Sequence, residues 1–200
     1  MDSPNIYLSP EEREKLENAR VGIAGAGGLG SNCAMHLVRA GVKKLVIADF
    51  DTIVPSNLNR QFFFARQIGM KKTEALSENL RAISPGVELE LRDTRIDGRN
   101  AVEIFGDCDV TAEAFDGAEA KATLIGALAS RGRTVVAASG IAGWGRSNEI
   151  RLRKAADNLY IAGDMSSGVG EGMHPASPRV GIAAAMQANT IIAILLGKMV

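Results

Sequence analysis

The chain has 200 residues, and its 23 lysine and arginine residues are balanced by 23 aspartate and glutamate residues. A chain without net charge offers no electrostatic attraction to nucleic acid or to an anionic membrane, so we expect neither as a partner. The length favours one domain spanning residues 1–200, and a hydrophobic content of 46% with 22 glycines is typical of an α/β protein with many tight turns.

The first residues contain neither a basic segment nor an apolar segment, which predicts that the chain has no signal peptide and is cytoplasmic. Cys33 and Cys108 are the only cysteines and form no CxxC pair. We therefore expect both thiols to be reduced and to lie in the core. Ser9 followed by Pro10 predicts the start of a short helix.

Residues 21–32 predict a buried strand, a glycine turn and a helix in succession. The glycines of the turn are Gly25, Gly27, Gly28 and Gly30, with the spacing of a dinucleotide-binding fingerprint. Free backbone N–H groups at such a helix N-terminus bind phosphate, and side chains would block that approach. The turn therefore predicts a nucleotide site without specifying the nucleotide.

The second strand, predicted at residues 44–48, ends at Asp49, where folds of this kind place an acid on a ribose. A polar stretch at residues 52–66 follows, and its three adjacent phenylalanines predict an ordered loop with a short helical turn. Apolar residues on one face predict an amphipathic helix at residues 72–83.

Strands are predicted at residues 87–91, 109–115 and 134–138, with helices at 100–105 and 118–131. This alternation indicates a Rossmann-like α/β fold with a twisted, mainly parallel sheet and right-handed crossovers.

Beyond Gly140 the pattern predicts an appended antiparallel hairpin, with strands at 147–153 and 158–162 and a charged segment at 154–157 between them. Residues 165–177 are rich in glycine and serine and predict a mobile loop. Residues 180–196 form a mostly apolar run that is nearly long enough to span a membrane, but Gln187, Asn189 and Thr190 interrupt it. A buried helix, located at a subunit interface, explains this run better.

Four charged residues stand in sequence after the glycine turn. Asp49 and Asp116 fall at predicted strand ends, where ligands lie in doubly wound sheets, and Arg60 and Lys72 fall between them. Two cations and a metal-binding carboxylate suit a triphosphate with Mg²⁺ better than a nicotinamide cofactor. Each residue taken alone also fits a structural role: a turn or helix cap for the acids, a surface ion pair or solvated side chain for the cations.

Taken together, these residues resemble the motif series of the ThiF/MoeB/HesA superfamily of adenylating enzymes, which includes the ubiquitin-activating enzymes. The resemblance rests on Gly25-x-Gly27-Gly28-Leu29-Gly30-Ser31, Asp49-Phe50-Asp51, Asn57-Leu58-Asn59-Arg60-Gln61, Gly69-x-x-Lys72 and Asp116. The length and the segment Pro178-Arg179-Val180-Gly181-Ile182 are most similar to the short ThiF proteins of thiamine biosynthesis.

The resemblance implies that Mg-ATP adenylates the C-terminal glycine of a small sulfur carrier protein with a ubiquitin fold and a Gly-Gly end. It implies a nucleotide-binding set of Gly25, Gly27, Gly28, Gly30, Asp49, Asp51, Asn57, Arg60, Gln61 and Lys72. Asp49 would bind the ribose, and Asn57, Arg60 and Lys72 would hold the phosphates. Arg60, Lys72 and Asp116 would be catalytic, with Asp116 holding magnesium. It further implies a homodimer.

Some features depart from the family pattern. The chain lacks the two CxxC pairs that hold zinc in many members, so we expect no zinc. Because no cysteine follows Cys108, the reaction is expected to stop at the acyl-adenylate, with sulfur supplied by a separate donor protein. Lys121 stands where arginine is common. Three alternatives remain open: an adenylating enzyme for another carrier or substrate (in molybdopterin synthesis or tRNA modification), an NAD-dependent Rossmann oxidoreductase, and a non-catalytic scaffold.

Overall fold

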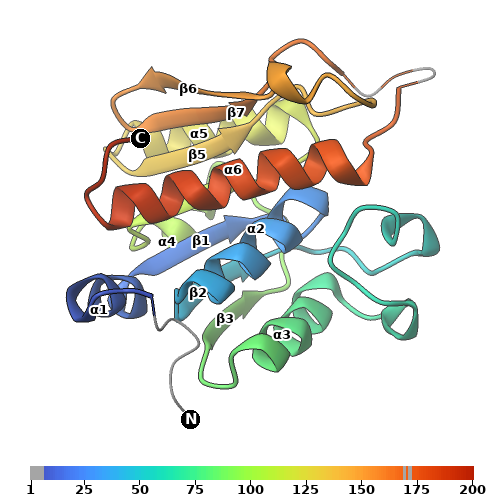
Figure 1. Ribbon diagram of the computed structural model, residues 1–200. Helices are drawn as coiled ribbons and strands as arrows, with labels where there is room; N and C mark the ends of the chain where they lie inside the picture. Colours follow the sequence, from blue (N-terminus) through green and yellow to red (C-terminus); the bar gives the residue numbers. More distant parts are fainter. Residues whose placement is uncertain (1–6, 169, 171–172) are drawn as a thin grey trace.

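The computed structural model describes residues 7–168, 170 and 173–200. Its centre is a seven-stranded sheet with the strand order β3-β2-β1-β4-β5-β7-β6 (Figure 1). All neighbouring pairs in it are parallel except β6 with β7. The strands are β1 Arg20–Ala24, β2 Lys44–Ala48, β3 Glu88–Arg92, β4 Val110–Glu113, β5 Thr134–Ala138, β6 Arg151–Ala156 and β7 Leu159–Gly163. The predicted α/β fold, with a mainly parallel sheet and an antiparallel C-terminal part, is confirmed.

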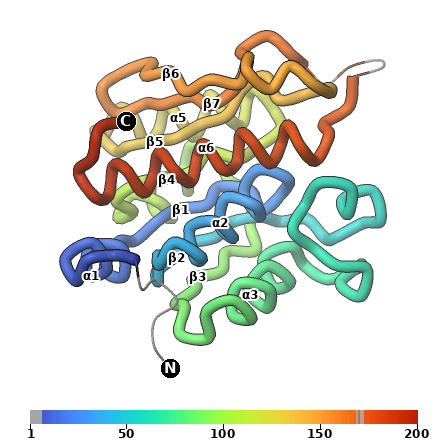
Figure 2. Tube along the Cα trace, in the orientation of Figure 1, coloured from blue at the N-terminus to red at the C-terminus, as the bar shows by residue number. Residues whose placement is uncertain are grey.

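Helices cover both faces of this sheet (Figures 1 and 2). One face carries α1 Pro10–Asn18, α2 Gly28–Ala40, α3 Lys72–Ile83 and α6 Ser177–Leu195, and the other carries α4 Ala101–Phe105 and α5 Ala118–Ala129. Two buried hydrophobic clusters correspond to these two layers. The parallel strands are nearly continuous apolar runs because helices bury them from both sides.

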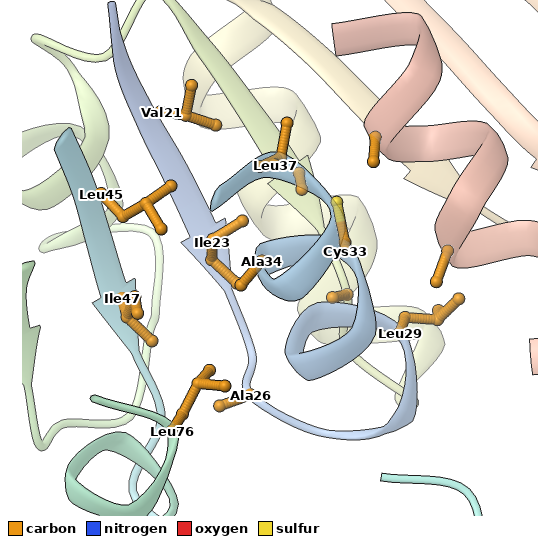
Figure 3. Close-up of a cluster of buried hydrophobic side chains, with 14 of the residues drawn as sticks. Val21, Ile23, Ala26, Leu29, Cys33, Ala34, Leu37, Leu45, Ile47 and Leu76 are labelled. Carbon is orange, nitrogen blue, oxygen red and sulfur yellow. The ribbon is translucent and has the colours of Figure 1, made fainter. Parts of the chain in front are cut away.

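The larger cluster lies between β1, β2 and the helices α2 and α6 (Figure 3). Ile23 and Ile47 project from the sheet toward Leu29, Cys33 and the rest of the α2 stripe, and all of them are buried. The four-residue spacing in α2 produces this contact because it aligns side chains along one helix face. Cys33 and Cys108 are both buried, as predicted.

Glycines allow α2 to start directly against the end of β1. Gly25 has a φ of +99°, which side chains rarely tolerate. A Cβ on Gly30 would lie 1.8 Å from the carbonyl oxygen of Gly25, so only glycine fits there.

The loop between β2 and α3 is ordered, as predicted. It contains the short 3₁₀ turns η1 Pro55–Asn57 and η2 Ala65–Gln67. An isolated antiparallel bridge between Thr52 and Lys71 closes the loop and brings its two ends together. Gln67 and Asn79 are buried and exchange side-chain hydrogen bonds of 2.9 and 3.1 Å, which fasten the loop to α3.

The C-terminal hairpin exists, but its first strand begins and ends later than the predicted bounds of 147–153. Residues 147–149 form the 3₁₀ turn η3 (Ser147–Glu149), and β6 continues to Ala156, through most of the predicted charged segment 154–157. Exposure of β6 explains the error, since a strand that buries almost nothing carries no period-two pattern. Its Arg151, Arg153 and Lys154 are side chains typical of an edge strand.

The last helix, α6, begins at Ser177, earlier than expected, with proline in its first turn. It is long and apolar enough to cross a membrane by length and composition, and here it packs on α2 and the sheet. Its other face keeps partly exposed apolar residues, among them Ile182 and Met186. Part of the predicted mobile loop, residues 169 and 171–172, lies outside the described residues.

Replacing Gly30 by alanine is expected to lower the free energy of unfolding by about 1–3 kcal/mol, because a Cβ there collides with fixed backbone. Gly126 in α5 is the matched control, since its Cβ would meet nothing within 4 Å. Gly126→Ala should raise the free energy of unfolding by about 0.5–1 kcal/mol. Urea unfolding measures both; a Gly30→Ala variant as stable as the parent would contradict the expectation.

Candidate functional site

A cavity of about 430 Å³ opens at the carboxyl ends of the parallel strands. Figure 1 shows these ends on the side where the β2–α3 loop projects. The sequence-predicted residues that line the cavity are Gly25, Gly27, Gly28, Asp49, Asp51, Arg60, Gln61, Lys72 and Asp116. Gly30 and Asn57 are not among the lining residues: Gly30 packs beneath the turn, and the Asn57 carboxamide oxygen accepts the N–H of Val54 (3.1 Å).

The glycine turn forms one wall of the cavity. Gly27 precedes the first turn of α2, and no side chain caps this helix, so the first N–H groups are available to an anion. A Cβ on Gly28 would lie 3.1 Å from Val180 and 3.3 Å from the Arg60 side chain. Glycine at this position lets the Arg60 side chain and α6 pack directly against the turn.

Asp49 supports the turn from the end of β2. Its carboxylate accepts the N–H of Ala26 at 2.7 Å and the N–H of Asp51 at 2.8 Å. Burial raises the pKa of Asp49, while the nearby Lys72 charge and these N–H groups oppose the rise. This carboxylate therefore joins the glycine turn to the β2–α3 loop at the cavity edge.

Asp51 and Lys72 form an ion pair of 2.6 Å between the carboxylate Oδ2 and Nζ. The Lys72 side chain is 8% exposed, whereas that of Asp51 is 48% exposed. Asp51 and Lys72 were both predicted to bind the nucleotide. In the structure, the Asp51 carboxylate is bound to Lys72.

Hydrogen bonds with α2 fix the backbone of the segment that contains Arg60. The amide of Asn32 donates to the Arg60 carbonyl (2.9 Å), and the Ser31 hydroxyl accepts the N–H of Phe62 (3.0 Å), which fixes this segment on α2. The Arg60 guanidinium donates to the Asn59 carboxamide at 2.8 Å and, within the described residues, forms no ion pair. Its positive charge is therefore not neutralised by an acid in that part of the chain.

Asp116 lies in the connection between β4 and α5, is exposed and lines the cavity. In the part of the chain that the structure describes, its carboxylate has no hydrogen-bond or ion-pair partner. A free carboxylate at this position can accept a hard cation, because Mg²⁺ binds through one or two carboxylates together with substrate phosphates.

Beneath Asp116 lies a buried ion pair that sequence reasoning missed. The Glu113 side chain is 0% exposed, and its two oxygens accept from Lys121 Nζ at 3.1 and 3.0 Å. Lys121 also donates to the Ala138 carbonyl, and Glu113 accepts the N–H of Phe115 at 2.7 Å. The pair joins β4, α5 and β5, and its Lys121 also lines the cavity. No local pattern signals it, because an acid within an apolar strand acquires its partner only through folding.

Two further buried polar contacts hold the cavity walls and were also missed. The Gln187 amide donates to the carbonyls of Glu113 (2.8 Å) and Val136 (2.9 Å), which ties α6 to two strand ends. Arg179 pairs with Asp164 at 2.5 Å and donates to the carbonyls of Gly145 and Arg146. Burial on its own would raise the pKa of Asp164, but hydrogen bonds from Ser167 and Ser166 lower it to about 2.

Lys121→Met should destabilise the protein by about 3–5 kcal/mol, because it leaves the Glu113 carboxylate buried without a counter-charge. The double variant Glu113→Gln, Lys121→Met removes both charges and should recover most of the loss. Burial already raises the pKa of Glu113, and losing Lys121 raises it further. The deficit of Lys121→Met should therefore be full at neutral pH and shrink as the pH falls and Glu113 protonates. Thermal unfolding at several pH values measures this; a pH-independent deficit, or no recovery in the double variant, would argue against it.

Comparisons with known proteins agree with this geometry. The ThiF family profile matches residues 3–200. The chain is 35% identical over 128 residues to the adenylyltransferase and sulfurtransferase UBA4 of Candida glabrata, covering 64% of this chain and 30% of that protein. It is 34% identical over 110 residues to the sulfur carrier protein adenylyltransferase of Thermus thermophilus, covering 54% of this chain and 41% of that protein. The chain thus matches less than half the length of these curated relatives.

A solved structure shares the fold over nearly the whole chain. The Escherichia coli tRNA N6-threonylcarbamoyladenosine dehydratase TcdA in complex with ATP superposes with a TM-score of 0.89 at 17% identity, covering 97% of this chain and 92% of that one. At 17% identity, this likeness shows a shared fold and nothing further. Together with the glycine turn and the cavity beside it, the profile match over residues 3–200 shows that this chain belongs to the ThiF family.

Proposed function

We propose that this protein is an ATP-dependent adenylyltransferase that activates the C-terminal glycine carboxylate of a small sulfur carrier protein with a ubiquitin fold. The observation that carries the proposal is the convergence of Arg60, Lys72 and Asp116 with the uncapped glycine turn on one cavity. The relatives of the chain include a sulfur carrier protein adenylyltransferase, which supports the same reaction.

In the proposed reaction, a carboxylate oxygen of the carrier bonds to the α-phosphorus of ATP and pyrophosphate leaves. Both reactants are anions, so charge neutralisation and in-line positioning provide most of the catalysis. The N–H groups of the α2 turn, Arg60 and Lys72 supply positive charge for the phosphates. Asp49, directly after β2, would accept the ribose hydroxyls through the lone pairs that its two backbone N–H partners leave unused.

Magnesium fits the same cavity, because Asp116 presents an exposed carboxylate without a partner among the described residues. When bound, the ion would neutralise charge on the phosphate oxygens. Asp116 would hold it, while the Glu113–Lys121 pair below keeps the β4–α5 connection in place.

Part of the cavity lining consists of small residues, which is compatible with an extended peptide tail. Gly140, Ala142 and Gly168 are among them, and their lack of bulky side chains lets the backbone of a tail approach closely. We propose that the carrier tail enters in extended form beneath the loop 165–177, of which residues 169 and 171–172 are not described. The described parts of the loop that line the cavity beside this path are Ser167, Gly168 and Pro175.

The cysteines argue for a reaction without a covalent enzyme intermediate. Burial raises the pKa of both Cys33 and Cys108 to about 12, so neither thiol is a competent nucleophile near neutral pH. We therefore propose that the product is the acyl-adenylate and that a separate donor protein supplies sulfur.

The partly exposed apolar face of α6 supports a homodimer, because a twofold interface would cover it. Sedimentation in solution would test this.

We further propose that the protein is a cytoplasmic enzyme of thiamine biosynthesis. A carrier for molybdopterin synthesis, or a substrate in tRNA modification, is the alternative for the same adenylation chemistry.

The central prediction is ATP–pyrophosphate exchange that requires Mg²⁺ and a carrier ending in Gly-Gly. Arg60→Ala and Asp116→Ala should each reduce the exchange by about 10²-fold or more, since each removes a preorganised charge from the cavity. Ligand-induced thermal stabilisation provides the control: Mg-ATP should raise the unfolding temperature and NAD should not. Stabilisation by NAD alone, or exchange with a free amino acid in place of the carrier, would refute the proposal.

A double variant, Cys33→Ala with Cys108→Ser, should keep the exchange activity. It should lose about 1–3 kcal/mol of stability because it leaves cavities in the two core layers. Intact mass of the parent protein after turnover, under non-reducing conditions, is the complementary measurement. A carrier attached to either sulfur would disprove the non-covalent mechanism.

A further inference from the structure

Two neighbouring lysines at the start of α3 are each paired with an aspartate. Lys71 pairs with Asp93 at 3.2 Å, and these side chains are 39% and 50% exposed. Lys72 pairs with Asp51 at 2.6 Å, and its side chain is only 8% exposed. The first pair lies on the surface, whereas both members of the second line the cavity.

The backbone fixes Asp51 beside Lys72. The Thr52–Lys71 bridge joins the two ends of the loop, and the N–H of Lys72 donates to the Asp51 carbonyl at 3.0 Å. The N–H of Asp51 donates to the Asp49 carboxylate. Asp51 is therefore held from both sides, and its carboxylate reaches Nζ from a fixed position.

A lysine ammonium has three protons to donate. Within the described residues, Asp51 Oδ2 is the one acceptor recorded for Lys72 Nζ. The two oxygens of Asp49, the other nearby acid, already accept backbone N–H groups. The pairing thus provides the counter-charge for a nearly buried cation and leaves donors of that cation for a ligand in the cavity.

From this geometry we propose that Asp51 is a positioning residue: it holds the Lys72 ammonium at the cavity for a polyphosphate ligand and does not itself contact the nucleotide. The identity of the ligand rests on the proposed function. The change in ligand affinity that this proposal predicts on removal of Asp51 is opposite in sign to the change that simple electrostatics predicts. Removing an acid beside a polyanion should strengthen binding by charge alone, whereas removing a group that positions the lysine should weaken it.

The experiment compares Asp51→Ala with Asp93→Ala, which removes the same charge from the neighbouring surface pair. Calorimetric titration with Mg²⁺ and a non-hydrolysable ATP analogue measures phosphate-dependent binding, and titration with adenosine measures the remainder. Asp51→Ala should weaken binding of the analogue about 10-fold or more, the scale of one hydrogen bond to a charged group, and leave adenosine affinity unchanged. Asp51→Asn keeps an acceptor oxygen and should lose less. Asp93→Ala should lose nothing.

Equal or tighter binding of the analogue by Asp51→Ala would overturn the proposal, because Asp51 would then compete with the ligand for Lys72. Equal losses for the analogue and adenosine would also overturn it, because they indicate general disruption of the cavity. The wild-type titration separates the two hypotheses. If wild-type protein binds neither the analogue nor inorganic triphosphate, the proposed function fails and this inference with it; if wild type binds and the variants match it, only the inference fails.

Discussion

The close approach of backbone at the β1–α2 turn is the constraint on which the rest of this structure depends. The α2 helix can begin directly at the end of β1 only because residue 30 is a glycine. A Cβ on Gly30 would lie 1.8 Å from the carbonyl oxygen of Gly25. Gly25 itself lies against the Ala114 carbonyl, where a Cβ would come within 2.9 Å. The same turn therefore docks α2 on the sheet, brings β4 close, and leaves the helix N-terminus facing the strand ends.

Charge balance around the cavity follows from that arrangement. Two ionic pairs, Asp51–Lys72 and Glu113–Lys121, satisfy four of the charged groups that surround it. Among the described residues that line the cavity, Arg60 and Asp116 form no ion pair, and the Asp49 carboxylate is held by backbone N–H groups alone. The cavity thus presents an unpaired cation and carboxylates without an ion-pair partner in that part of the chain, together with N–H groups of a helix terminus. An anionic ligand accompanied by a cation would satisfy all of them at once.

The opposite wall is held by polar contacts that are buried. Arg179, 1% exposed, joins the start of α6 to Asp164 after β7 and to carbonyls of the segment after Gly140. A buried ion pair contributes little net stability, since desolvation offsets the attraction, but breaking one partner is costly. Its effect here is to define one arrangement for the loop that contains Gly140, Gly143 and Gly145. Gln187 does the same for the strand ends under α6.

The sequence by itself determined the elements whose residues repeat with a regular period and the glycine turn whose spacing has a steric reason. The strand at Lys44–Ala48, the helix at Lys72–Ile83 and the mainly parallel character of the sheet were predictable because apolar periodicity and short connections leave few alternatives. Strand-end positions also indicated that Asp49 and Asp116 would lie at the ligand-binding edge of the sheet, and both line the cavity there. The edge strand β6 was not predictable, because it buries too little to carry a pattern.

Only the tertiary structure decided which charged groups are committed to one another. Glu113 forms an ion pair with Lys121, and Asp164 forms one with Arg179, because folding packs elements together that are separate in sequence. It also decided that Asn57 caps a turn outside the cavity and that the Asp51 carboxylate is bound to Lys72. The physical reason is common to all these cases. A residue type specifies which bonds a side chain can make, whereas the partner that it meets depends on where folding brings the other chain segments.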